Sequence, residues 1–288
     1  MATKLFTDYD EASAASSGDF LLLHDGDSVK KVQAANLAPG IDESVIHERI
    51  AGRQLPLVDL GTAYTAELKN DISSGTFKKA VVGGYLTINS HVYYFAHPDY
   101  WLHTGDTECT DHHMLVVPAG NLGSGKMNAG NDTVGAYIGS GLKSGTNHDS
   151  GTTANTALSD VAAIIKADFG ANNILKHREY FSNAVTSEYE SAGSWYDSEI
   201  DLMNEQMVYG CKVFGNTKHG TNIPNDYTID KSQLKLFQER PDLITIRANW
   251  WLRDVVSGAY FALVTGYGGA HIYSASDSPG VRPAFAIC

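Results

Sequence analysis

The last forty or so residues restrict the fold more than any other part of the chain. Across Ala248–Cys288, short runs rich in aromatic and β-branched residues are separated by glycine turns. Such side chains favour strands and glycine permits tight turns, so the pattern predicts an antiparallel meander. The adjacent Trp250 and Trp251 at its start, and Phe285 and Ile287 at its end, suit strands that lie partly in a core.

Helix signals come before this meander. Capping residues, apolar residues at helical spacing, and a terminal glycine or proline predict helices over about 65–72, 160–169 (capped by Ser159), 197–210 and 230–241. Strands are expected at 115–117 and, as a hairpin around Asn89, at 85–88 and 92–95. The small and polar residues of 120–153 predict a long surface insertion. Helices together with a terminal antiparallel meander indicate the α+β class.

The first forty residues differ from the rest. Asp19–His24 and Ser28–Gln33 are strand candidates on either side of Asp25-Gly26-Asp27, which favours a hairpin turn. One hairpin buries too little apolar surface to be stable alone, so we expect residues 1–40 to need a partner or oligomerisation. Residues 41–59 form a connector, with a helix over Ile41–Gly52 that either packs on the main domain or supports oligomerisation. The main domain is predicted to span residues 60–288.

Composition excludes several classes of function. A formal net charge of −12 argues against a nucleic-acid partner, because neutralising phosphates requires clustered Lys and Arg. No apolar run approaches the roughly 20 residues of a membrane span, and the first residues lack the apolar core of a signal peptide. We therefore expect a soluble chain made in a cytoplasm. Cys109, Cys211 and Cys288 have no metal-type spacing, which predicts free thiols.

Six short motifs occur in order along the chain: Gly84–Asn89, His103–Asp106, Ser194–Glu199, Leu202–Gly210, Trp250–Arg253 and Gly280–Phe285. Together they resemble the family of C-type-lectin-like, or formylglycine-generating-enzyme-like, domains found in virion proteins of phages and prophages of gut bacteria. The resemblance covers roughly Leu60 to Cys288 and implies a C-type-lectin-like fold there. Residues 1–40 resemble the short modules that hold phage fibres on a virion.

The resemblance implies a virion protein, made in the host cytoplasm: a head fibre, tail fibre or tail-tip adhesin whose C-terminal domain binds a glycan or protein on the bacterial surface. Other capsid or tail proteins would be its partners, and the threefold symmetry of many such fibres implies a homotrimer. A capsid decoration protein that stabilises the shell is one alternative. An enzyme of the formylglycine-generating type is another, but its family uses paired cysteines that have no counterpart here, so we expect no enzymatic activity.

The meander also holds side chains suited to binding. Tyrosine and serine together provide large contact area and adaptable hydrogen bonds, and in some proteins of the family this region is diversified by retroelements. Trp250, Trp251, Arg253 and Arg282 are the predicted scaffold, with an ion pair expected around Arg253, Asp254 and Arg282. The tryptophans either line a sugar site or pack in the core. The predicted ligand-binding surface consists of Tyr260, Thr265, Tyr267, His271, Tyr273, Ser274, Ser276 and Asp277, whereas Ala262 and Val264 are expected to face the core.

One dense polar cluster is a candidate metal site. Imidazole and carboxylate ligands for zinc or calcium are offered by His103, Asp106, Glu108, His112 and His113. The alternative is a turn at Thr104–Asp106 with the histidines bonded to the backbone. A bound metal would be structural rather than catalytic, and no other cofactor is expected.

Overall fold

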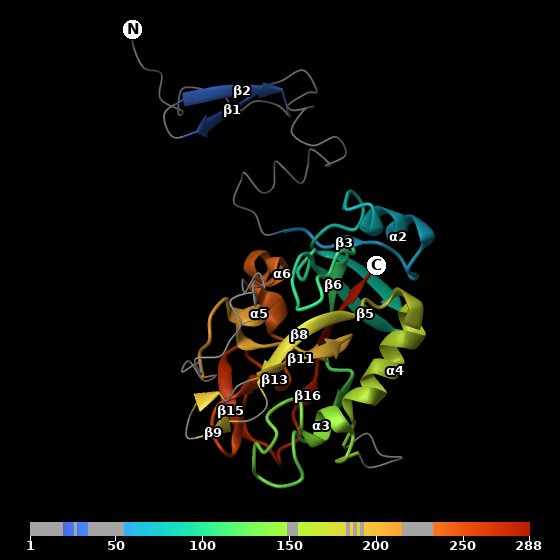
Figure 1. The fold of residues 1–288 in the computed structure, drawn as a ribbon. Coiled ribbons are helices and arrows are strands. Elements are labelled where there is room, and N and C mark those ends of the chain that lie inside the picture. The colour runs from blue at the N-terminus through green and yellow to red at the C-terminus, as the bar shows by residue number, and fades with distance from the viewer. Residues whose placement is uncertain are drawn as a thin grey trace. The chain divides into compact units, whose positions relative to one another are not determined.

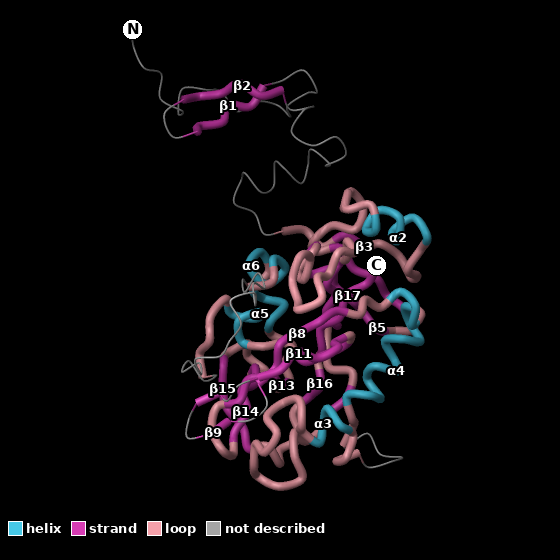
Figure 2. Tube along the Cα trace, in the orientation of Figure 1, coloured by secondary structure: helices cyan, strands magenta, loops and turns pink. Residues whose placement is uncertain are grey.

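A computed structural model describes residues 55–148, 155–182, 193–214 and 233–288, together with the backbone of four short strands outside these ranges. The chain forms two compact units, Met1–Arg53 and Gln54–Cys288. The second unit thus begins a few residues before the boundary placed at residue 60. The described residues combine helices with largely antiparallel sheets, which confirms the α+β class (Figures 1 and 2).

The first unit contains the predicted hairpin. β1 (Phe20–Asp25) pairs antiparallel with β2 (Ser28–Gln33), so that Asp25 lies opposite Ser28. The helix expected over Ile41–Gly52 and the rest of the predicted attachment module lie outside the described residues.

A six-stranded sheet forms much of the second unit. In spatial order its strands are β12 (Ile200–Leu202), β17 (Pro283–Ile287), β6 (Met114–Pro118), β5 (His91–Pro98), β4 (Gly84–Ile88) and β3 (Val58–Asp59). β4 and β5 are the predicted hairpin. Asn89 and Ser90 in its turn both have left-handed φ angles, of +48° and +70°, as the tightest hairpin turns require. The buried strand predicted at 115–117 is β6.

A five-stranded sheet carries the C-terminal meander. In spatial order its strands are β15 (Ala270–Ser274), β14 (Tyr260–Val264), β13 (Trp250–Val255), β16 (Gly280–Val281) and β7 (Gly123–Ser124). β13, β14 and β15 pair antiparallel in sequence order, which confirms the meander. β16 runs parallel to β13, with Gly280 opposite Trp250.

The last strand leaves the meander and enters the other sheet. The early strand region Tyr85–Phe95, the natural candidate in the sequence for a partner of Phe285–Ile287, does not pair with it. β17 lies between β6 and β12, with Phe285 opposite both Val116 and Ile200. β5 already has β4 and β6 as neighbours, so the free edge of β6 receives the terminal strand.

Short helices flank the sheets. They are α2 (Ala66–Ser73), α3 (Gly141–Ser144), α4 (Leu158–Phe169), α5 (Glu205–Tyr209) and α6 (Lys235–Glu239), with 3-10 turns η3 (Ala171–Asn173) and η4 (Pro241–Ile244). As predicted, the Thr65 hydroxyl caps α2 by accepting the Leu68 amide (3.3 Å). α4 begins earlier than expected, because the Asp160 carboxylate accepts the Ala157 amide (2.8 Å) and Ser159 is not the cap. The helix predicted over 230–241 is shorter in the described residues, because α6 begins only after Leu234 and ends before Arg240.

The helix predicted over 197–210 is wrong in its first half. Residues there form β11 (Gly193–Ser198) and β12, and only α5 is helical. β11 pairs with β8 (His177–Ser182), and two further short strands, β9 (Val185–Thr186) and β10 (Tyr189–Glu190), pair with each other. Ile200, Met203 and Met207 fit helical spacing and also fit a strand followed by a short helix. Pairing with distant β17 decides between the two.

The stretch 120–153 is not a surface insertion in its described part. Met127, Tyr137 and Leu142 are each at most 3% exposed and join the main core. Small residues are needed because the backbone passes close to other groups. A Cβ on Gly125, for example, would lie 2.4 Å from the Thr156 carbonyl oxygen. Glycine therefore reflects tight packing at Gly123, Gly125, Gly139 and Gly141, whereas Gly120 has open space around it.

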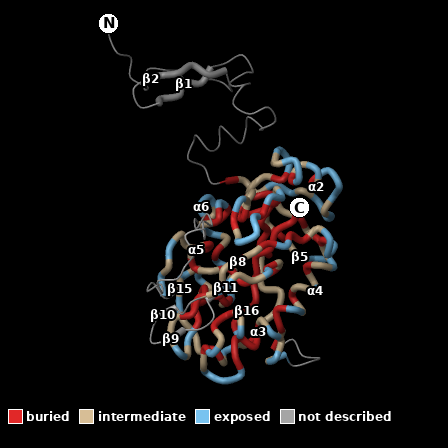
Figure 3. The backbone as a smooth tube through the Cα atoms, in the orientation of Figure 1, coloured by how far each residue is buried: buried red, intermediate tan, exposed pale blue. Residues whose placement is uncertain are grey.

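Strand alternation divides the core into two clusters. On β17, Phe285 and Ile287 join the cluster that contains α2 and α4 side chains, whereas Ala284 and Ala286 join the one that contains α5 and α6 side chains. Figure 1 accordingly shows α2 and α4 on one side of the strands and α5 and α6 on the other. Figure 3 shows the buried residues gathered between them. Each large apolar side chain in these clusters contributes roughly 1.5–3 kcal/mol.

Candidate ligand-binding surface

The tryptophans beneath the predicted binding surface belong to the core. Trp250 and Trp251 are both 0% exposed and enter opposite core clusters, so neither ring can stack on a ligand. The Trp251 indole N–H donates to the Gly125 carbonyl (2.7 Å). This fixes the start of β13 and gives the neighbouring hairpin a rigid base.

Arg253 is paired, but with a partner distant in sequence. Its guanidinium forms a buried ion pair with Glu179 of β8, whose carboxylate also bonds His177 Nε2 (3.1 Å). Burial alone would raise the pKa of Glu179, but the charge of Arg253 and the bond to His177 outweigh it and hold that pKa at about 2. The Asp254 carboxylate instead accepts the Glu205 amide (2.7 Å). The ion pair expected around Arg253, Asp254 and Arg282 is therefore wrong.

Arg282 lies at the junction of the two sheets, between β16 and β17, and is 0% exposed. Its guanidinium donates to the carbonyls of Pro118 (2.8 Å) and Leu243 (3.1 Å). It also lies over the rings of Trp250 and Phe237, 4.9 and 5.5 Å from their centroids. Burial lowers the pKa of Arg282 to about 9, which leaves it charged at neutral pH. Its role is structural, as the sequence suggested, but without a carboxylate partner in the described part of the chain.

The predicted binding residues lie on both faces of the edge strand β15. Tyr260 lies opposite Ser274 and shares its face with Ala262 and Val264, which are buried as predicted. His271 and Tyr273 belong to the opposite face, because successive strand residues alternate. The predicted surface therefore wraps around a sheet edge instead of forming one flat face.

The tyrosines of this surface differ in exposure. Tyr267 is 94% exposed and Tyr260 38% exposed, and His271 is also exposed, as predicted. Tyr273 is only half-buried and packs against the core. Its ring meets that of His271 edge-on at 5.6 Å, and its hydroxyl accepts a hydrogen bond from Asn249 (3.1 Å). Tyr273 is therefore less exposed than expected.

Tyr267 stands on a strongly hydrogen-bonded turn between β14 and β15. The Thr265 amide donates to the Gly269 carbonyl (2.8 Å), and the Gly268 amide donates to the Thr265 carbonyl (2.9 Å). Outside contacts hold the turn as well: the Gly268 carbonyl accepts the Tyr209 hydroxyl (3.1 Å), and Gly266 is bonded by Asn249. The backbone that carries the exposed ring is thus fixed on several sides.

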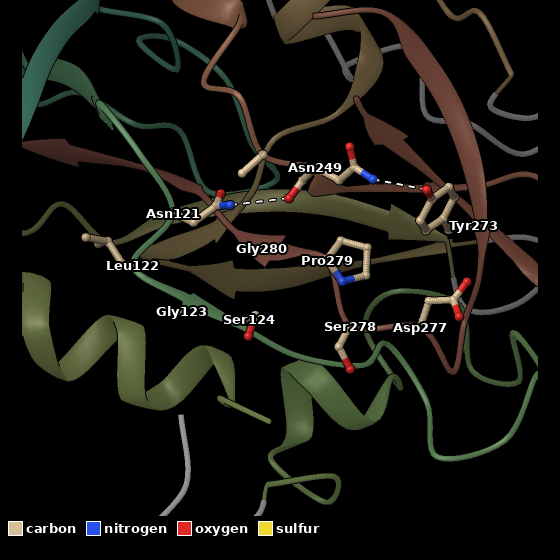
Figure 4. Close-up of a pocket in the computed structure, with 11 residues that line it drawn as sticks. Asn121, Leu122, Gly123, Ser124, Asn249, Tyr273, Asp277, Ser278, Pro279 and Gly280 are labelled. Carbon is tan, nitrogen blue, oxygen red and sulfur yellow. Dashed lines mark hydrogen bonds between the residues drawn. The ribbon is translucent and has the colours of Figure 1, made fainter. Parts of the chain in front are cut away.

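The remaining predicted residues border an open groove (Figure 4). Tyr273 and Asp277 line it, Ser274 and Ser276 lie beside them in sequence, and Thr265 belongs to the adjoining turn. The groove is completed by Ser278, next to Asp277, and by residues from distant segments, chiefly Asn121, Ser124 and Asn249. Sequence reasoning missed the last three, because β7 and the segment before β13 meet only through the pairing of β16 with both.

Asn249 connects the walls of this groove. Its side-chain amide donates to the Tyr273 hydroxyl, and its side-chain oxygen accepts the Gly266 amide (2.8 Å). Its backbone carbonyl accepts the Gly280 amide (2.9 Å) and the Asn121 side-chain amide (3.3 Å). The one sequence signal for it was its position directly before the tryptophan pair. Asn249 thus links the turn that carries Tyr267 to the groove and to Trp250 at the start of β13.

The predicted metal site is wrong. In the described ranges, which include all five proposed ligands, no three His, Cys, Asp or Glu side chains come together to hold an ion. His113 uses both ring nitrogens on the backbone: Nε2 accepts the Trp101 amide (3.0 Å) and Nδ1 bonds the Asp111 carbonyl (2.8 Å). Burial lowers its pKa, so it remains neutral.

The other four proposed ligands have separate partners. His103 bonds Glu108 at the surface (2.6 Å), and His112 bonds Asp99 (2.8 Å). The Asp106 carboxylate pairs with Arg178 of β8 (2.7 Å). The alternative that the sequence left open holds only for His113, because His103 and His112 bond carboxylates rather than the backbone.

Comparisons with protein-family models, curated proteins and solved structures find no match to this chain. None of the helices in the described ranges has the length and apolar character needed to cross a membrane.

Proposed function

We propose that the chain is a bacteriophage or prophage virion protein whose unit from Gln54 to Cys288 is a C-type-lectin-like domain that binds the bacterial surface. The observation that carries this proposal is Tyr267, a tyrosine 94% exposed on a rigid turn. A tyrosine presented to solvent on a fixed turn supplies the contact area and the hydroxyl that binding loops use.

The manner of display supports a role in recognition. Ordering a flexible loop on binding costs free energy, and a turn already fixed by hydrogen bonds avoids much of that cost. Tyrosine supplies contact area and a hydroxyl while losing few rotamers, which is why binding loops favour it. Tyr260, His271 and Asp277 add exposed polar and aromatic groups around the same edge of the sheet.

The first unit would attach the domain to the particle as a homotrimer or on a trimeric partner. The support is that residues 1–53 form a compact unit of their own, and that the hairpin, the described part of this unit, is too small to bury a core alone. Light scattering of the intact chain tests this. A threefold mass is expected, and a monomer that also binds no virion protein would contradict it.

Host binding is tested by labelling the purified full chain with a fluorophore and measuring its retention on a panel of gut bacterial strains. Tyr267→Ala should lose at least about tenfold in affinity, the size expected for a central aromatic contact. Its melting temperature should stay unchanged because the ring is exposed. Lys78→Ala, an exposed change near α2, is the control. Equal binding by the Tyr267→Ala protein and the wild type would contradict the proposal.

A capsid decoration protein remains the rival. Immunogold labelling of virions distinguishes the two, since a fibre is labelled at a projecting tip or tail and a decoration protein over the whole shell.

A further inference from the structure

The groove beside Tyr273 is built from three segments far apart in sequence. The turn after β15 supplies Asp277 and Ser278, the segment before β13 supplies Asn249, and the segment leading into β7 supplies Asn121. Figure 4 shows these side chains gathered around Pro279 and Gly280. A concave site in which a few polar groups converge from separate segments is the usual form of a small-ligand site.

The charge of the groove excludes one large class of ligand. None of the described residues that line it is Lys, Arg or His, and one, Asp277, is acidic. Phosphates and carboxylates need cationic or multiple backbone donors. The net charge of −12 adds to the repulsion of anions. A ligand of this groove is therefore uncharged or cationic.

The hydrogen-bonding groups narrow the choice further. The exposed Asp277 carboxylate is an acceptor with no hydrogen-bond or ion-pair partner among the described residues. The Tyr273 hydroxyl already accepts from Asn249 and retains its own proton to donate. The side-chain oxygen of Asn121 has no partner in the described structure, but it is buried and so is not counted as a ligand contact. An acceptor and a donor in one groove suit a ligand whose hydroxyls both donate and accept.

The site is also preformed. The Asn121 amide lies so close to Gly280 that a Cβ there would be 1.8 Å from its nitrogen, so this position of the groove floor has no room for a side chain. The Gly280 amide and the Asn121 side chain both bond the Asn249 carbonyl (2.9 and 3.3 Å). A floor made of backbone and locked amides loses little entropy when a ligand binds.

We propose that this groove binds a neutral saccharide, with Asp277 accepting hydroxyl protons and the Tyr273 ring and hydroxyl lying against the sugar. Adjacent sugar hydroxyls match alternating acceptors and donors, and a sugar's C–H face matches a tyrosine ring. The proposal deepens the proposed function, on which it rests only in taking the saccharide to be part of the bacterial surface.

Saturation-transfer NMR on the full chain tests the site. The neutral probes are the methyl glycosides of glucose, galactose and mannose, and N-acetylglucosamine; glucuronic acid and glucose 6-phosphate are the anionic probes. We expect transfer to at least one neutral probe and none to the anionic ones. Asp277→Asn should weaken binding about tenfold, the value of one charge-assisted hydrogen bond, and leave the melting temperature unchanged because the side chain is exposed.

Lys78→Ala is the control, since this exposed side chain lies outside both the groove and the proposed binding surface, and it should keep full saccharide binding. Tyr273→Phe keeps the ring and removes the hydroxyl, so it should weaken binding without unfolding the domain. Absence of transfer to every neutral probe, stronger binding of the anionic sugars, or full binding by Asp277→Asn would each overturn the proposal.

The two proposals fail in different ways. If a neutral sugar binds and Asp277→Asn weakens that binding, but the chain binds no bacterial cells, the saccharide proposal holds and the proposed function fails. If the chain binds cells through Tyr267 and no neutral sugar binds, the groove proposal fails and surface recognition stands.

Discussion

Replacing the buried Arg282 with methionine should cost the domain less stability than replacing it with lysine. The guanidinium is fully buried, and burial lowers its pKa by between three and four units, to about 9. At 1.36 kcal/mol per pKa unit, this difference corresponds to roughly 5 kcal/mol spent on keeping the charge out of water. Methionine removes the charge and fills most of the same volume.

Methionine also removes two hydrogen bonds. The carbonyls of Pro118 and Leu243 would lose their donor, at about 1–3 kcal/mol each. The gain and the loss are of similar size, so the net change for Arg282→Met should be within about 2 kcal/mol. Lysine keeps the cost of the buried charge. Its ammonium cannot bridge both carbonyls or lie flat on the rings of Trp250 and Phe237, so a loss on the order of 3 kcal/mol or more is expected.

Urea unfolding of the wild type and both variants at pH 7, followed by tryptophan fluorescence, measures this. The reasoning predicts the stability order wild type ≈ Arg282→Met > Arg282→Lys. A well-folded lysine variant beside a methionine variant that loses several kcal/mol would refute it. That result would mean that the positive charge itself holds the two sheets together.

Two further predictions concern the core. Truncation after Gly280 removes β17, including the fully buried Phe285 and Ile287, and should unfold the second unit. These two side chains alone contribute several kcal/mol to a free energy of unfolding that is about 5–15 kcal/mol in total. Thermal melting that the truncation leaves unchanged would contradict this prediction. Glu179→Gln should destabilise by roughly 3 kcal/mol at pH 7, because a folded-state pKa of about 2 lies below the ordinary value. The lowered pKa of Glu179 stabilises the folded state at pH values above the unfolded-state pKa, and this stabilisation is lost as the pH falls through the folded-state pKa. The difference in unfolding free energy between wild type and Glu179→Gln should therefore disappear between about pH 4.5 and 2. A difference that does not change with pH would show that the charge of Glu179 is not responsible.

The meander and the first hairpins could be predicted because their signals are local. Strand-forming side chains, glycine turns and the capping Thr65 act over a few residues, and each corresponds to an element of the structure. The stretch 197–210 lacked such a signal, since Ile200 and Met203 fit both a helix and a strand. Only the pairing of β12 with β17, more than eighty residues later, distinguishes them.

The candidate site could be predicted only in part for the same reason. Tyr267 and Asp277 lie in turns between recognisable strands, so their exposure follows from sequence. Asn121 and Asn249 reach the groove through long-range pairing, and the position of Asn249 before the tryptophan pair does not by itself mark it as a groove residue. The histidine cluster shows the reverse: close spacing from His103 to His113 suggested a metal, but each residue has its own partner nearby.

The central claim, that the surface around Tyr267 meets the bacterial cell, is tested most directly by photo-crosslinking. A photoreactive phenylalanine analogue is placed at position 267 in one protein and at position 78, on the exposed loop after α2, in another. Each full chain is bound to cells of a strain that retains the wild type and is then irradiated. We predict covalent adducts with cell-envelope material from position 267 and none from position 78. Equal yields from both positions, or adducts from position 78 alone, would contradict the account.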